Sequence, residues 1–228
     1  MQENEPKREY EIKNDYSYAT GRARALEAKI KEPELMGPEQ VLKEYGLAGK
    51  DIDASLEELM QASLREFEES APDAVEPFRL MADLENMKAF IRNKRMGASI
   101  PYSALSSFEI PETKEELAAR LREKGHVELA DKLGGLFSMR LGEADLSLEN
   151  HFTGRIKNPL FLEYIELLKS YLKSDEAPAQ FYLRLLHFIK ERYTTKNMGP
   201  EVATGFLLLR QRELAQVRAK AIKALLGG

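Results

Sequence analysis

Apolar residues recur along much of the chain with the period of an α-helix, and the clearest example lies in residues 77–96. One apolar stripe on this segment consists of Leu80, Leu84, Met87 and Ile91. Pro77 suits a first helical turn, because a proline there loses no intrahelical hydrogen bond. Gly97 suits a left-handed C-terminal stop. The pattern predicts a helix from Pro77 to Met96.

The same period, with proline, glycine and capping signals, predicts helices over most of the chain. Asp53 is the candidate N-cap of the third helix, followed by a capping box of Ser55 and Glu58. Residues 98–111 read as a loop, and the glycine-rich stretch 134–158 fits neither pattern clearly. The predicted helices cover about residues 15–32, 38–46, 54–70, 77–96, 113–125, 159–173, 178–193 and 200 to nearly the C-terminus.

No alternating strand pattern lasts more than a few residues, so the expected fold class is all-α. We expect an N-terminal helical part, residues 1–150, and a C-terminal helical part, residues 151–228. Segments 78–91 and 206–219 resemble each other, with a glutamate seven residues after a phenylalanine in both. Duplication of a helical lobe and chance similarity between two amphipathic helices both explain this likeness.

Two short polar side chains, Asp83 and Asn86, lie beside the apolar stripe of the 77–96 helix. Arg92 falls about 180° from Asp83 around the helix, so the two cannot pair within it. A carboxylate at the margin of a core needs a partner, because unpaired burial is costly. We expect another helix end, a loop amide or a distant arginine, and a salt bridge to Arg210 is one specific hypothesis. A role as general base or ligand is the alternative.

Arginines also mark the first and last predicted helices. Arg22 and Arg24 diverge from a small-residue stripe on the first helix, which indicates helix packing or contact with an acidic partner. Arg210 falls inside an apolar face of the last helix, where it either extends its charged end to solvent or meets a carboxylate.

Composition narrows the possible functions. The chain has 228 residues, no cysteine and a net charge of −4, which argues against a general nucleic-acid binder. Residues 51–70 contain seven acidic residues and one arginine, whereas residues 196–228 contain six basic and two acidic residues. This gradient suggests charged contacts within the chain or with partners. The start has no apolar stretch behind its charges, so we expect no signal peptide.

The three histidines offer the main candidates for chemistry. His126 lies near Glu128 and Asp131 in sequence, and His187 and Glu191 are four residues apart. Either group could bind a metal, although neither forms a known metal signature. A small helical metal-dependent enzyme is therefore one alternative function, and an unrelated helical scaffold or interaction protein is another.

Several motifs resemble the C subunit of archaeal and bacterial V-type ATP synthases, whose counterpart in the eukaryotic vacuolar ATPase is subunit d. A Tyr-x-Tyr-x-x-x-Arg-x-Arg-Ala segment, an Asp-x-x-Asn-hydrophobic-Lys helix with a basic end, an IPYSAL segment and a final helix of Lys-x-x-Glu-x-x-x-x-Arg character carry the likeness. The matching residues are Tyr16, Tyr18, Arg22, Arg24, Ala25, Asp83, Asn86, Met87, Lys88, Arg92, Lys94, Arg210, Glu213 and Arg218.

The resemblance implies a non-catalytic rotor adaptor that couples the central shaft to the membrane proteolipid ring during proton or sodium transport. It implies no cofactor and a cytoplasmic location, peripheral on the cytoplasmic face of the membrane. It also implies two similar helical lobes, with room for a reduced third, in an elongated or funnel-shaped bundle. The residues expected to contact partners or stabilise the fold are Arg22, Arg24, Asp83, Asn86, Arg92, Arg210 and Arg218.

Overall fold

The computed structural model describes residues 16–194 and 199–226, and its regular structure there is helical throughout, which confirms the all-α prediction. The elements are α1 (Ser17–Glu27), the 3-10 helix η1 (Pro33–Leu35), α2 (Pro38–Glu44), α3 (Ile52–Arg65), α4 (Pro72–Met96), α5 (Lys114–Glu123), α6 (Val127–Leu136), α7 (Leu141–Thr153), α8 (Pro159–Leu172), α9 (Pro178–Thr194) and α10 (Pro200–Leu225).

Local signals set most helix ends as predicted. Proline occupies the first turn of α2, α8 and α10, and α9 begins at Pro178. Gly97 ends α4 with φ 64°, a conformation that glycine adopts without steric cost. The Thr113 side chain accepts a hydrogen bond from the Glu116 amide (3.2 Å) and so caps α5.

Two predicted helix starts are wrong. Asp51, not Asp53, caps α3 by accepting a hydrogen bond from the Ala54 amide (3.0 Å). Helix α4 starts at Pro72, so Pro77 lies inside the helix rather than in its first turn. Either proline could open the helix by local rules alone, and the apolar stripe does not distinguish the two starts.

Two further stretches differ from the sequence prediction. Helix α1 ends at Glu27, several residues before the proline that was expected to stop it. The unassigned stretch 134–158 is largely helical, since it contains the end of α6 and all of α7. Residues 98–111 are non-helical, as predicted.

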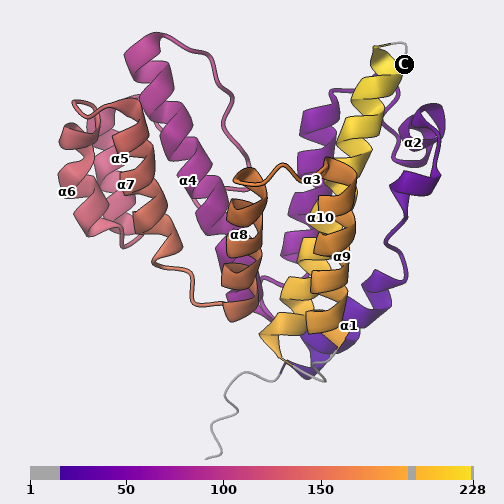
Figure 1. Ribbon diagram of the computed structural model, residues 1–228. Coiled ribbons are helices and arrows are strands. Elements are labelled where there is room, and N and C mark those ends of the chain that lie inside the picture. The colour runs from indigo at the N-terminus through magenta and orange to yellow at the C-terminus, as the bar shows by residue number, and fades with distance from the viewer. Residues whose placement is uncertain (1–15, 195–198, 227–228) are drawn as a thin grey trace, which may run out of the picture.

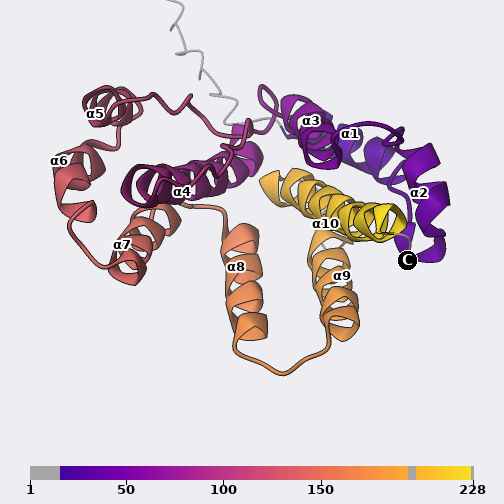
Figure 2. The same cartoon turned by 90° about the horizontal axis from the view of Figure 1, so that it is seen from above.

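Helix α10 is the centre of one group of helices. It packs against α1, α2, α3 and α9 (Figures 1 and 2). Its N-terminal half is almost wholly buried, including Phe206, whose ring centroid lies 5.6 Å from that of Phe67. The last helix therefore joins the N-terminal helices in one core.

The second group gathers on the C-terminal half of α4. Helices α5, α6 and α7 lie on the far side of α4 from α10 (Figure 1), and α7 runs antiparallel to α4. The ring of Phe90 in α4 meets Phe137, just after α6, edge-on at 6.0 Å between centroids. The two groups of helices diverge from each other toward the C-terminal end of α4 (Figure 1).

The groups join where α4, α8 and α10 begin. The rings of Phe78 and Phe161 meet edge-on with centroids 4.9 Å apart. The buried Asn158 caps α8 by accepting from the Phe161 amide (3.1 Å) and donates to Thr204 of α10 (2.7 Å). The expected boundary between residues 1–150 and 151–228 stays a prediction, and residues from both sides of it share this junction.

Asn158 also explains how α4 tolerates an internal proline. Pro77 has no amide hydrogen, so the carbonyl of Asp73, four residues earlier, receives no intrahelical bond from it. Asn158 donates to that carbonyl instead (3.2 Å). A backbone acceptor that has lost its usual helical donor is thereby satisfied by a neighbouring helix cap.

Candidate functional site

A row of polar side chains on α4 binds the non-helical segment 100–108, which runs antiparallel to the helix. We call this row the polar clamp, and its members are Arg79, Asp83, Asn86 and Asn93. From the C-terminal end of α4 backward, Asn93 contacts Ile100 and Asn86 contacts Ser103. Asp83 then contacts Ser106 and Ser107, and Arg79 contacts Leu105. The segment is thus fixed in register along nearly four turns of helix.

Asp83 is the most buried member of the clamp, with no exposed surface. One carboxylate oxygen accepts from the Ser106 hydroxyl (2.5 Å) and the Ser107 amide (2.7 Å), and the other accepts from the Ser107 hydroxyl (2.7 Å). Three donors therefore satisfy a carboxylate that would be costly to bury alone. The loop amide expected as a partner of Asp83 is confirmed.

Asn86 and Asn93 bind the segment in one shared manner. The Asn86 side chain donates to the Ser103 carbonyl (2.9 Å) and accepts from its amide (2.7 Å). The Asn93 side chain makes the same pair of bonds with Ile100, both at 2.8 Å. A side-chain amide offers the same donor and acceptor as a peptide group, so each asparagine takes the place of a neighbouring strand residue.

The sequence prediction missed Asn93. It lies seven residues after Asn86, which places both on one face of the helix. The seven-residue spacing of two asparagines could therefore have identified Asn93 as a member of the same polar row.

The clamp also connects the two groups of helices. Arg79 donates to the Leu105 carbonyl and to Gln61 of α3, both at 2.8 Å, and it pairs with Glu68 just after α3. Glu57 of α3 accepts from the Ser103 hydroxyl and from the Ala104 amide (2.7 Å). Segment 100–108 is therefore hydrogen-bonded to both α3 and α4.

The hypothesis of a salt bridge between Asp83 and Arg210 is wrong. Arg210 instead pairs with Glu213, one turn later on α10, at 2.5 Å. Glu213 is 1% exposed and also accepts from the Lys31 amide (3.0 Å) and the Tyr45 hydroxyl (2.5 Å). Of the two outcomes expected for Arg210, contact with a carboxylate is the one observed, and the carboxylate belongs to the same helix.

The other predicted arginines pair with carboxylates, most of them across elements. Arg22 of α1 pairs with Glu66 after α3 (2.7 Å), and Arg218 of α10 pairs with Asp53 of α3 (2.6 Å). Arg92 of α4 pairs with Asp145 of α7 (2.6 Å). Arg24 differs, since its pair with Glu27 (3.6 Å) stays within α1.

His126 forms a close pair with His151, which the sequence did not suggest. His126 Nδ1 lies 2.9 Å from His151 Nε2, and the ring of Phe152 packs against both. Burial, the Arg155 charge and His151 lower the pKa of His126 to about 4. Burial, Arg155 and Lys132 lower the pKa of His151, while Glu128 opposes them. Both rings are therefore neutral at pH 7, and one donates to the other.

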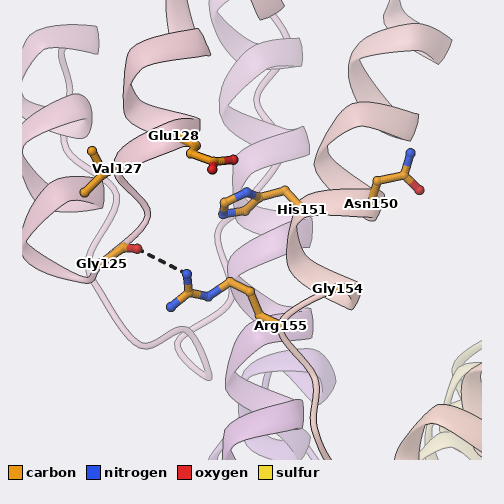
Figure 3. Close-up of a pocket in the computed structure, with 7 residues that line it drawn as sticks. All are labelled: Gly125, Val127, Glu128, Asn150, His151, Gly154 and Arg155. Carbon is orange, nitrogen blue, oxygen red and sulfur yellow. Dashed lines mark hydrogen bonds between the residues drawn. The ribbon is translucent and has the colours of Figure 1, made fainter.

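An open pocket of about 390 Å³ lies beside this pair (Figure 3). His151 reaches it from α7 and Glu128 from the start of α6, and Arg155 donates to the Gly125 carbonyl (3.1 Å) at its edge. The remaining lining residues are Val127, Asn150 and Gly154. The lining is polar, with charges of both signs.

The metal-binding hypotheses gain no support from the geometry. Asp131 pairs with Arg122 (2.8 Å), and His126 pairs with His151. His187 and Glu191 lie 3.8 Å apart on exposed side chains. Among the residues that the structure describes, no three His, Asp or Glu side chains converge as a metal site would require.

Fold and site together define an all-helical protein whose two groups of helices are connected by a side-chain clamp on a non-helical segment. Comparison with known proteins finds no match, since no family model, curated protein or solved structure is detectably similar to the chain. In residues 16–194 and 199–226, no helix combines the length and apolarity needed to cross a membrane.

Proposed function

We propose that the protein is a rotor adaptor of a V/A-type ATPase, which couples the central shaft to the proteolipid ring and performs no chemistry. The residue motifs that resemble the C subunit family support this proposal. The comparison with known proteins adds nothing to it, so the roles of the motif residues in the fold carry the argument.

One observation carries the proposal: several of the residues that supply the resemblance connect different elements. Arg22 links α1 to the end of α3, Arg92 links α4 to α7, and Arg218 links α10 to α3. Asp83 and Asn86 bind the segment after α4. An adaptor that transmits torque must resist relative motion of its helices, and such cross-links oppose that motion.

The buried contacts add stiffness that surface pairs alone would not give. Exposed ion pairs contribute only about 0–1 kcal/mol each. The clamp is stronger because Asp83 has no exposed surface, and Glu213 itself is almost fully buried. Glu213 also belongs to the motif of the last helix, and it connects α10 to residues between α1 and α3.

Binding to the shaft tests the proposal directly. The purified chain is titrated with the purified central-shaft subunit of the same source, and isothermal calorimetry measures the affinity. We expect a one-to-one complex. Arg92→Ala removes a link between α4 and α7 and should weaken binding, whereas the matched Arg120→Ala removes a pair confined to α5 and should leave it unchanged.

An unrelated helical scaffold is the rival that this experiment addresses. Such a protein would have the same internal cross-links but would not bind the shaft. A chain that is folded by circular dichroism and shows no binding heat with the shaft subunit would contradict the adaptor proposal.

A further inference from the structure

The C-terminal end of α4 carries an exposed cluster of apolar and basic side chains. We call it the α4 tip, and it consists of Lys94, Arg95, Met96, Ile100, Tyr102, Met139 and Arg140. Internal contacts connect its three segments. Asn93 binds the Ile100 backbone and lies 3.3 Å from the Tyr102 hydroxyl, and Arg95 donates to the Met139 carbonyl (2.7 Å).

The apolar members of the tip are exposed although the helix beneath them is well packed. Met96 is 65% exposed, and Ile100, Tyr102 and Met139 are each more than one-third exposed. Single exposed apolar residues are ordinary, but four at one helix end indicate a contact surface. The tip is the end of a helix that stands apart from the α10 group (Figure 1), and the pocket beside His151 lies elsewhere.

Charge at the tip opposes that of the whole protein. The chain carries −4 overall, yet no acidic residue occurs between Glu85 and Glu109. Lys88 and Arg92, which precede the tip on α4, pair with carboxylates of α7. The side chains of Lys94, Arg95 and Arg140 are exposed. Glu143 is the acidic residue nearest in sequence to Met139 and Arg140. Three exposed cations therefore lie on the same segments as the apolar cluster.

We propose that the α4 tip docks on an anionic lipid surface. Basic side chains are attracted to acidic headgroups, and methionine, isoleucine and tyrosine side chains can enter the interface between headgroups and acyl chains. A membrane surface presents many headgroups side by side, so the cations and the apolar side chains of the tip can contact it at the same time. An acidic protein is the competing occupant.

Flotation of the full chain with vesicles tests the proposal at low salt. We expect binding to phosphatidylcholine vesicles that contain phosphatidylserine, little binding to phosphatidylcholine alone, and loss of binding as salt screens the charges. Each cation near an anionic surface strengthens binding roughly fivefold, so Lys94→Gln with Arg140→Gln should weaken it roughly 25-fold. Met96→Ser with Met139→Ser should weaken it as well.

Matched controls separate the tip from general charge and hydrophobicity. Lys157→Gln with Lys173→Gln removes two exposed lysines elsewhere, and Leu172→Ser removes a leucine that is 80% exposed. Both controls should bind vesicles like the unaltered chain. Equal loss in the tip and control variants would overturn the proposal.

The test is independent of the rotor proposal, because pure lipid vesicles contain neither shaft nor proteolipid. Absence of binding to phosphatidylserine vesicles would overturn the lipid proposal whatever the shaft experiment gives. The competing outcome is that the unaltered chain does not bind vesicles and the tip variants no longer bind an acidic protein partner. The tip would then be a protein-binding surface and the lipid proposal would be wrong.

Discussion

Asp83 shows how one side chain can determine the path of a segment more than 20 residues away in sequence. It has no exposed surface and accepts from two hydroxyls and one amide of Ser106 and Ser107. A buried ionised carboxylate is stable only with such donors, and the donors need the carboxylate in turn. This mutual requirement fixes segment 100–108 against α4.

Replacing Asp83 should therefore be costly. Asp83→Ala removes three hydrogen bonds that a fully buried carboxylate accepts from the Ser107 amide and two hydroxyls, and we expect the free energy of unfolding to fall by about 3 kcal/mol. Urea denaturation followed by circular dichroism measures the change. The matched control is Asn93→Ala, which removes three hydrogen bonds of a partly exposed, uncharged side chain near the tip and should cost about 1 kcal/mol. Similar values for the two variants would contradict the stated role of burial.

The histidine pair predicts a pH dependence of stability. In the unfolded chain His126 should titrate near its ordinary pKa of about 6.5, whereas the folded chain resists protonation until about pH 4. Between these values the unfolded state binds more protons, so the free energy of unfolding falls as pH falls, by about 2 kcal/mol. Full stability is present above pH 6.5, and the lowered pKa of His151 acts in the same direction.

Urea midpoints measured from pH 7.5 to 4.5 test this dependence. His126→Leu should flatten the curve, because it removes the group that the folded state keeps neutral. His187→Gln is the control, since the His187 side chain is 82% exposed and should leave the curve unchanged. A curve for His126→Leu that coincides with that of the unaltered chain would refute the assignment.

At the scale of elements, α4 depends on its neighbours to accommodate Pro77. The Asp73 carbonyl lacks a helical partner and accepts from Asn158, which also caps α8 and binds Thr204. We expect Asn158→Ala to lower the free energy of unfolding by about 2–3 kcal/mol, since it removes a helix cap and the hydrogen bonds to Thr204 and to the Asp73 carbonyl. Asn150→Ala, at an exposed position of α7, should have little effect.

A double variant isolates the contact with Asp73. Alanine at position 77 restores an amide hydrogen that can bond the Asp73 carbonyl within the helix. Pro77→Ala combined with Asn158→Ala should therefore be less destabilised than the sum of the two single changes, as a double-mutant cycle in urea measures. Strict additivity would show that the proline and the asparagine are not coupled through that carbonyl.

The sequence predicts those features of the helices that depend on nearby residues. Proline and glycine signals locate the starts of α8, α9 and α10 and the end of α4, because these preferences act within one turn. The start of α4 was missed, since Pro72 and Pro77 satisfy the same local rule. The glycine-rich stretch 134–158 fits neither local pattern, and packing on α4 stabilises α7 there despite weak local signals.

The partners of polar side chains were harder to predict than the helices. Helical geometry shows that Asp83 and Asn86 lie beside the core and that Arg92 points elsewhere. The spacing of residues on one helix does not show which residue of another segment faces it. The sequence therefore suggested Arg210 as a partner of Asp83, whereas the partners are Ser106 and Ser107. The pairing of His126 with His151 likewise depends on how α6 and α7 pack.

At the scale of the molecule, two groups of helices are connected at more than one level. The core around Phe78, Phe161 and Asn158 joins them where α4, α8 and α10 begin. Nearer the C-terminal end of α4, segment 100–108 bridges α3 and α4 through Glu57 and the polar clamp. Two separated connections resist twisting better than one, which is the property that a torque-transmitting adaptor needs.

Isolation of the native assembly tests the rotor proposal most directly. A tagged copy is purified from the membranes of its source in mild detergent, and mass spectrometry identifies and quantifies its companions. We predict the central-shaft subunit and the proteolipid in fixed ratio to the tagged chain. Recovery of an intact rotary ATPase from the same extract without this chain, and of the chain without shaft or proteolipid, would contradict the account.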